Sequence, residues 1–337
     1  MIRLSHGAGG VETEELLEKL IFSRVALKKV GEGGLGLDFP DDAAAIPIGE
    51  KKWLVVTVDA YTVYPPFFPG GDIGLLAASG SINDVLMLGG RPVALLDSIV
   101  VEEGFPLADL ERITQSLIST LERLGVALIG GDFKVMPKGQ VDKIVITTVG
   151  VGVAEGKIIV DRPRPGDVVV VTGPVGDHGA VVLAERLGLG GGPKSDVRPL
   201  MDLYPLIEKY REAINAARDP TRGGLAMVLN DWAKAGGVAI VVDQSKVRVR
   251  PETRAVADYA GIDPLNLASE GAAVFSVPGA VAEDFLRDLR AAGFPDAEII
   301  GEVREGGRYK GVVLARTEVG GYRIVEPPRG ELVPRIC

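Results

Sequence analysis

Cysteine is almost absent from this sequence, because only the last of its 337 residues, Cys337, carries a thiol. A single cysteine cannot form an intramolecular disulfide, which excludes a disulfide-stabilised secreted fold and makes a cytoplasmic location the default expectation. Histidine is nearly as scarce. His6 and His178 lie far apart and have no cysteine beside them, which argues against a zinc site.

Long apolar runs and excess positive charge are also missing. No segment reaches the ~18 uninterrupted apolar residues of a membrane helix. The opening segment MIRLSHGAGG lacks the apolar stretch of a signal peptide. The formal net charge of −9 leaves no general basic surface for nucleic acid. We therefore expect no contact with a membrane or with nucleic acid.

Helical and strand patterns alternate through both halves of the chain. In the first half we expect helices at 13–20, 73–88 and 107–124 and strands at 53–58, 93–101, 126–129 and 143–153. In the second half we expect helices from about 179 and at 202–217, 223–235, 252–260 and 280–292, with strands at 168–172, 238–242, 272–277, 298–303 and 311–315. The turn-rich segment 161–167 separates the halves. These patterns predict an α/β (α+β) fold with domains at 1–155 and 156–325 and an irregular, exposed tail at 326–337.

Familiar nucleotide-binding signatures are not supported. The segment GGPKS at 191–195 imitates the end of a P-loop but has Pro193 in place of the required glycine. The run GEGGLG at 31–36 fits a dinucleotide pattern, yet it lacks both a preceding strand and a following helix.

Acidic residues instead gather at the ends of apolar segments. Asp42 precedes a short apolar run, Asp59 closes a predicted strand, and the group Gly130-Gly131-Asp132 closes another. Asp84 lies inside an apolar helix, where an unpaired carboxylate is costly. Magnesium shared between carboxylates and nucleotide phosphates would satisfy these groups. Turns and structural hydrogen bonds remain an open alternative.

Together these segments resemble the HypE family of hydrogenase maturation proteins, within the PurM-like superfamily of enzymes similar to aminoimidazole ribonucleotide synthetase. The matching segments are HGAGG (6–10), DDAAA (41–45), PPFFPGGDIG (65–74), SINDVLMLGGRPVAL (81–95), GGDFKV (130–135), DRPRPGD (161–167), TGPVGDHG (172–179), RDPTRGGLA (218–226), LASEG (267–271) and PRIC (334–337). The DDAA-type and ND-type motifs occur across the superfamily, whereas PPFFPGGDIG, GDHG and PRIC are more specific. Ala60, Phe133 and Ser269 depart from the residues usual at their positions, which are serine, threonine and asparagine.

This resemblance implies a two-domain PurM-like fold whose N-terminal domain forms the ATP site and the dimer interface, followed by a C-terminal α/β domain and a flexible tail. The implied activity is that of an ATP-dependent carbamoyl dehydratase. A carbamoyl group received on Cys337 from the partner HypF would be dehydrated to a thiocyanate, and the cyanide passed to the iron of [NiFe]-hydrogenase on a HypC–HypD scaffold. ATP and Mg²⁺ are the implied cofactors, and a homodimer is the implied assembly.

Roles for individual residues follow from the same motif match. Mg²⁺ ligands are expected among Asp42, Asp59, Asp84 and Asp132. Nucleotide contacts are expected from Gly7, Gly9, Gly10, Asp42, Asn83, Asp84, Gly131 and Asp219. Lys134 would polarise the carbamoyl oxygen or steady phosphate charge, Glu270 is the candidate general base, and Cys337 is the carrier. In the tail, Gly330 could act as a hinge and Pro334 could stiffen the approach to the thiol.

Each role has a plainer alternative. Lys134 and Glu270 would otherwise be surface charges, the glycines of 7–10 a flexible leader, and Asp219 a helix cap. Selenophosphate synthetase and thiamine-monophosphate kinase are rival enzymes. The former normally has a catalytic cysteine or selenocysteine near its N-terminus, which this chain lacks, and the latter needs no terminal thiol. A catalytically inert scaffold that only presents its tail is the remaining alternative.

Overall fold

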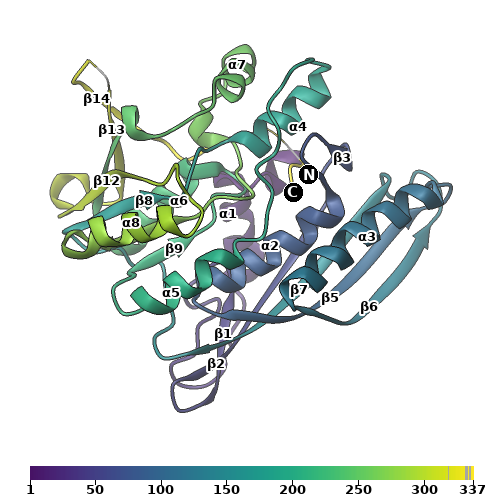
Figure 1. Ribbon diagram of the computed structural model, residues 1–337, viewed down its shortest axis with the longest axis horizontal. Helices are drawn as coiled ribbons and strands as arrows, with labels where there is room; N and C mark the ends of the chain where they lie inside the picture. The colour runs from purple at the N-terminus through teal and green to yellow at the C-terminus, as the bar shows by residue number, and fades with distance from the viewer. Residues whose placement is uncertain (318, 331–332, 334) are drawn as a thin grey trace.

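The protein is built around two β-sheets, one in each half of the chain (Figure 1). A computed structural model describes residues 1–317, 319–330, 333 and 335–337. Pro334, the first residue of the PRIC ending, lies outside these described residues. The first sheet has the strand order β1-β2-β7-β5-β6, and the second has the order β14-β13-β10-β12-β8-β11-β9. The predicted α/β fold class is confirmed.

Helices α2 (Ile73–Met87) and α3 (Leu107–Leu124) cover one face of the first sheet. Its strands are β1 (Ala44–Gly49), β2 (Lys52–Tyr61), β5 (Arg91–Glu102), β6 (Ala127–Met136) and β7 (Ile144–Glu155), with a short hairpin, β3 (Phe67–Phe68) and β4 (Gly71–Asp72), beside it. Helices α2 and α3 pack together on the covered face. Helix α2 is apolar almost throughout and is buried, and its first turn is capped by the Asp72 carboxylate, which accepts hydrogen bonds from the Gly74 and Leu75 amides at 2.9 and 3.0 Å.

The second sheet alternates with helices along the sequence. Its strands are β8 (Asp167–Val171), β9 (Ala216–Arg218), β10 (Ala239–Asp243), β11 (Val274–Pro278), β12 (Glu298–Arg304), β13 (Val312–Arg316) and β14 (Tyr322–Ile324). The helices of this half are α4 (Asp177–Leu187), α5 (Tyr204–Tyr210), α6 (Gly224–Gly236), α7 (Pro251–Ala260) and α8 (Ala282–Ala291). Short helical turns lie at Leu4–Gly7, Glu18–Phe22, Met201–Leu203, Gln244–Lys246, Pro264–Asn266, Gly279–Val281 and Gly307–Tyr309.

One continuous apolar core joins the two halves. It includes Leu76 and Leu86 of α2 together with Ile207, Phe275 and Phe285 from the second half. Burial of this many large side chains across the junction holds the halves together, at roughly 25 cal/mol for each Å² of apolar surface removed from water. Residues that face each other across the junction are therefore held in fixed relative positions.

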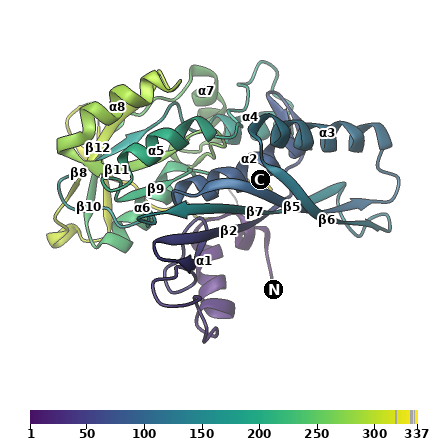
Figure 2. The same cartoon turned by 60° about the horizontal axis from the view of Figure 1, so that its bottom comes forward.

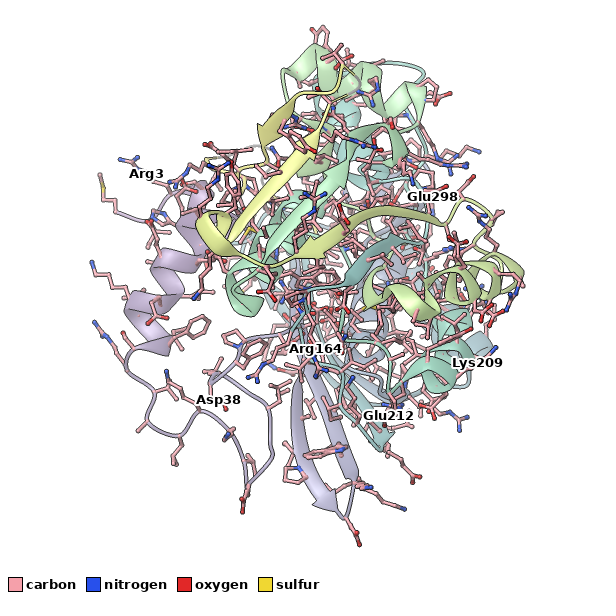
Figure 3. All side chains as sticks on the ribbon, turned by 90° about the vertical axis from the view of Figure 1, so that its left-hand side faces the viewer. Arg3, Asp38, Arg164, Lys209, Glu212 and Glu298 are labelled. Carbon is pink, nitrogen blue, oxygen red and sulfur yellow. The ribbon has the colours of Figure 1, made fainter. Side chains whose placement is uncertain are left out.

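The N-terminal leader and the C-terminal tail meet. Helix α1 (Val11–Leu17) and the loop that carries Asp38 stand apart from the body (Figures 2 and 3). The Val11 amide donates a hydrogen bond to the Pro328 oxygen at 3.2 Å, and the Gly330 amide donates to the Glu12 carboxylate at 3.2 Å. The expectation of an exposed tail is wrong for its described end, because Val333 and Ile336 are buried against the core and Cys337 is half-buried.

Two expected elements differ from the structure. The helix expected over 202–217 ends at Tyr210, because residues 216–218 form strand β9, which pairs with β11. The strand expected over 126–129 continues to Met136, so Gly130, Gly131 and Asp132 lie inside β6 and do not close it. A register shift in the pairing of β5 with β6, between Leu95–Leu128 and Leu96–Gly130, marks a bulge at Ile129 that the pattern did not reveal.

Candidate active site

A cavity of about 910 Å³ lies between the leader, the first sheet and the second half of the chain. It is lined by Gly7, Gly9 and Gly10 of the leader, by Asp42 ahead of β1, and by Asp219 after β9. The fold therefore brings together five of the residues expected to contact a nucleotide, although Asp219 is more than 170 positions from the other four in the sequence. The cavity is also lined by Asp161, Arg218 and Arg222, for which the sequence motifs predicted no role.

Asp42 and Asp84 are joined through Thr57. The Thr57 hydroxyl donates to Asp84 Oδ2 at 2.7 Å and lies 3.1 Å from the Asp42 backbone oxygen. Burial raises the pKa of both carboxyl groups well above their usual range. For Asp84, the neighbouring Asp59, Asp219 and Asp42 raise the pKa further, which places these four carboxylates in one electrostatic group.

Arg218 supplies positive charge to this acidic group. Its Nε lies 2.8 Å from Asp161 Oδ2 and 3.2 Å from Asp42 Oδ1, and its Nη1 lies 2.9 Å from Asp231 Oδ2. Burial raises the pKa of Asp161 to about 7, against the opposing effect of Arg218. The segment RDPTRGGLA predicts a role for Asp219, but nothing in the sequence shows that its first arginine is buried among aspartates.

Two buried carboxylate oxygens are suited to bind a cation that is also coordinated by phosphates. Asp42 Oδ2 and Asp219 Oδ2 are buried and have no hydrogen-bond partner in the described part of the chain. Burial, followed by the charge of Asp59, raises the pKa of Asp219 to about 7. No three acidic, histidine or cysteine side chains among the described residues stand close enough to hold one ion by themselves. Mg²⁺ normally takes one or two carboxylates and completes its shell with water and phosphate oxygens, so this arrangement suits it.

The leader glycines are required by close packing. Gly9 has φ +78°, and a Cβ atom built there would lie 2.3 Å from Arg222 Cβ. A Cβ atom on Gly10 would lie 2.5 Å from the Pro328 oxygen. The leader thus lies directly over Arg222 and against the tail, so the alternative of an unattached leader does not hold for these residues.

Asn83 is engaged with the protein backbone. Its side-chain amide donates to the Arg198 oxygen at 3.2 Å and lies 3.5 Å from the Glu270 oxygen, while its Oδ1 accepts from the Leu200 amide at 2.8 Å. These bonds fix the segment that carries Glu270. The expected contact of Asn83 with a nucleotide remains a prediction, and its observed bonds give it a structural role.

Gly131, Asp132 and Lys134 lie apart from the other candidates within one chain. They lie on β6, where Lys134 Nζ forms an exposed ion pair with Asp132 Oδ1 at 2.5 Å. Strand β6 is separated from β2 by β7 and β5, a distance of about 14 Å at the usual strand spacing. Asp59 lies on β2 and belongs to the acidic group, whereas Asp132 does not.

Cys337 lies within electrostatic reach of the candidate base. Burial raises the pKa of the thiol, and the charges of Arg222, Glu270, Asp59 and Asp219 are near enough to act on it. Glu270 is 1% exposed, and its Oε1 has no hydrogen-bond partner in the described residues. Burial raises the pKa of Glu270 well above its usual range, and Asp219 and Asp196 raise it further. Electrostatic interactions thus link Cys337 and Glu270 to Arg222, which lines the cavity.

Known proteins match this chain over its whole length. Residues 40–154 and 164–314 match the N-terminal and C-terminal domains of AIR synthase related proteins. A carbamoyl dehydratase HypE from Cupriavidus necator is 40% identical over 100% of this chain and 95% of its own. The corresponding protein of Escherichia coli K12 is 37% identical over 100% of this chain and 99% of its own.

The chain belongs to the HypE family. HypE proteins are carbamoyl dehydratases of hydrogenase maturation, so this chain is an enzyme of that class. A solved HypE–HypF complex superposes with a TM-score of 0.84 at 38% identity, covering 95% of this chain and 100% of that one. A HypE solved in complex with ATP superposes with a TM-score of 0.81 at 35% identity, covering 100% of each chain. These similarities confirm the PurM-like fold of the HypE family for this chain. None of the helices in the described residues is long and apolar enough to span a membrane.

Proposed function

We propose that this HypE-family enzyme uses ATP to dehydrate a carbamoyl group carried on Cys337 to a thiocyanate, the source of the cyanide ligands of the iron in [NiFe]-hydrogenase. One observation carries the proposal: the chain's single thiol lies within electrostatic reach of buried Glu270 and of Arg222, and Arg222 lines the cavity together with Asp42, Asp219 and the leader glycines. A carrier thiol, a base and an anion-binding cavity are the parts that this reaction needs.

The cavity is the proposed ATP site. A HypE relative has been solved with ATP. Asp42 and Asp219 have buried, unpartnered oxygens and are the proposed ligands of Mg²⁺, with Asp59 and Asp84 close by. When bound, Mg²⁺ neutralises phosphate charge during phosphoryl transfer. Arg222 supplies further positive charge to the phosphates, and the amides of Gly7 and Gly10 are the proposed backbone donors, since the Gly9 amide donates to the Thr13 hydroxyl.

The dehydration requires the carbamoyl oxygen to become a leaving group. The γ-phosphoryl group passes from ATP to that oxygen and leaves ADP. The carbon–oxygen bond then breaks and inorganic phosphate departs, while the nitrogen forms a triple bond to carbon and loses both of its protons. Tethering to Cys337 makes the step intramolecular and retains the reactive product.

Glu270 is the proposed acceptor of a proton from the carbamoyl nitrogen. Its raised pKa means that burial favours the neutral acid, and that the carboxylate is a stronger base once it is ionised. Arg222 lowers the pKa of Glu270 and so supports the ionised form. Glu270 thus combines proximity to the thiol with basicity suited to a weakly acidic N–H.

A homodimer is proposed across the open face of the first sheet. The edge strand β6 exposes Ile129, Phe133 and Val135, and Val58 of β2 is 65% exposed on the same sheet. Exposed apolar side chains on a long edge strand favour pairing with another chain. Lys134 is too far from Cys337 to act on it within one chain, so its proposed role in polarising the carbamoyl oxygen depends on this dimer.

Other features remain proposals. HypF is the proposed carbamoyl donor, because a relative has been solved as a HypE–HypF complex. We also propose delivery to a HypC–HypD scaffold, a cytoplasmic location, and the division into 1–155, 156–325 and 326–337. The two matched domain regions, 40–154 and 164–314, are compatible with that division.

Mass spectrometry of the terminal peptide tests the chemistry. Incubation with a HypF carbamoyltransferase, carbamoyl phosphate and ATP should first add one carbamoyl group to Cys337. That adduct should then lose water only while ATP is hydrolysed. Cys337→Ala should show no adduct, and full activity in this variant would refute the proposal.

The variant Glu270→Gln separates catalysis from a scaffold role. It should still be carbamoylated but should lose water about 10²- to 10⁴-fold more slowly, as expected for loss of a general base. Glu283→Gln changes an exposed carboxylate of α8 and serves as the matched control. Equal dehydration by all three proteins would remove Glu270 from the mechanism.

A further inference from the structure

The last three residues of the tail are held in place through their backbone oxygens. The main-chain oxygens of three successive residues are each bound, and none of these contacts uses the Cys337 sulfur. The Arg335 oxygen accepts from Arg186 at 2.5 Å and the Ile336 oxygen contacts His178 Nε2 at 2.8 Å. The Cys337 oxygen accepts from the Thr62 amide at 2.9 Å and from its hydroxyl at 3.2 Å.

His178 is the buried member of this set. It is the second residue of α4, within the GDHG motif, and is 0% exposed. Its ring packs edge-on against Phe68, with the ring centroids 5.1 Å apart. Figure 1 shows the C-terminus close to α4 and β3. The proposed reaction does not use this buried imidazole.

The hydrogen-bond network determines the tautomer of His178. A carbonyl oxygen can only accept, so the proton of the neutral ring must lie on Nε2, facing Ile336. Nδ1 is then an acceptor, and Ser195 Oγ, 2.8 Å away, must donate to it. Ser195 Oγ in turn accepts from the Val197 amide at 3.1 Å. Burial lowers the pKa of His178 to about 4, which keeps the ring neutral in this network.

We propose that His178, fixed in the Nε2–H tautomer by Ser195, is a positioning residue that reads the Ile336 carbonyl and sets the register in which Cys337 enters the active site. The inference rests on the proposed function, in which Cys337 is the carrier. Recognition through the backbone leaves the sulfur free to hold a carbamoyl or cyano group. A one-residue slip of the tail would move the thiol by ~3.3 Å, away from Glu270.

The rate of alkylation of Cys337 by iodoacetamide in the full-length protein reports this docking, because the chain has no other cysteine. His178→Phe fills the site and removes the donor, whereas His178→Gln retains an N–H donor. Loss of one buried hydrogen bond should speed alkylation about five- to tenfold in His178→Phe, with His178→Gln close to the unchanged protein. Glu185→Gln, an exposed change on the same helix, is the matched control.

A loss of ATP affinity together with a lower melting temperature would show that a variant has unfolded generally. If His178→Phe does not fold, Ser195→Ala carries the test, since it removes the donor to Nδ1 and should speed alkylation about two- to fivefold. An alkylation rate equal to that of the unchanged protein in His178→Phe, or in Ser195→Ala where that variant carries the test, would overturn the proposal. So would equally fast alkylation of the Gln and Phe variants.

A single-turnover measurement connects the docking to the reaction. Carbamoylated His178→Phe should lose water about fivefold or more slowly than carbamoylated His178→Gln, while both become carbamoylated to the same extent. The alkylation assay needs neither ATP nor a partner protein. A failure of carbamoylation in the unchanged protein would therefore refute the proposed function and still leave the docking test decisive.

Discussion

At the scale of single residues, the guanidinium of Arg218 lies between carboxylates from three parts of the chain. Asp42, Asp161 and Asp231 are each within 3.2 Å of it. Taking several like charges out of water is expensive, and a buried counter-charge offsets that cost only while its geometry is kept. Arg218 therefore stabilises the wall of the cavity, in addition to supplying positive charge there.

Replacing Arg218 by methionine tests this role. The change keeps much of the side-chain volume but leaves buried carboxylates without their counter-charge, which should lower the free energy of unfolding by about 3–5 kcal/mol. Urea denaturation at pH 8 measures it. Arg287→Gln, which disrupts ion pairs of an exposed guanidinium with Asp284 and Asp288, should leave the same quantity nearly unchanged, because surface ion pairs contribute little. Similar losses in both variants would contradict the account.

At the scale of elements, the bounds of these helices could be predicted better than those of the strands. The periodicity at 107–124 gave both ends of α3, and the apolar run at 73–88 gave α2 to within a residue. The bulge at Ile129 leaves no mark on the pattern of residue types, so β6 was expected to end near it. Short edge strands such as β14 have too few residues to show a period.

Strand β6 also carries the prediction about assembly. Phe133 is 49% exposed on an edge strand whose neighbours are also exposed, so an aspartate there should oppose pairing of two copies. Sedimentation analysis should show a dimer for the unchanged protein and a monomer for Phe133→Asp. Tyr259→Asp, at an exposed position of α7, should remain dimeric. A monomer at micromolar concentration for the unchanged protein would refute the dimer.

At the scale of the whole molecule, the site depends on contacts that no local pattern contains. The motifs predicted roles for Asp42, Asp84, Asp219, Glu270 and Cys337, and the structure brings the three aspartates into one electrostatic group. They did not show that Asp132 and Lys134 would lie three strands away, nor that the tail would be docked. Both depend on how the sheet is ordered and on long-range contacts, such as the one between Thr62 and Cys337.

The buried carboxylates give the whole molecule a characteristic response to pH. Burial raises the pKa of Asp161 and Asp219 to about 7 and of Asp196 and Asp231 to about 6. The unfolded chain releases these protons near pH 4, so between pH 4 and 7 the folded protein binds more protons than the unfolded one. His178, whose pKa burial lowers to about 4, has the opposite effect, but it is one group against four. Stability should therefore fall as pH rises through this range, and the loss is complete above the folded pKa values of the four carboxyl groups.

Thermal unfolding should show this effect and its reversal by ligand. We expect the melting temperature to fall by about 5 °C or more from pH 5.5 to 8.5, since each unmatched proton changes the free energy of unfolding by about 1.4 kcal/mol per pH unit. Mg²⁺ with ATP should raise the melting temperature more at pH 8.5 than at pH 5.5, because positive charge favours the ionised carboxylates. Asp219→Asn should flatten the pH dependence, whereas Glu283→Gln, at an exposed carboxylate of α8, should not. A melting temperature that rises between pH 5.5 and 8.5 would contradict the conclusion that ionisation of these buried carboxyl groups destabilises the folded protein.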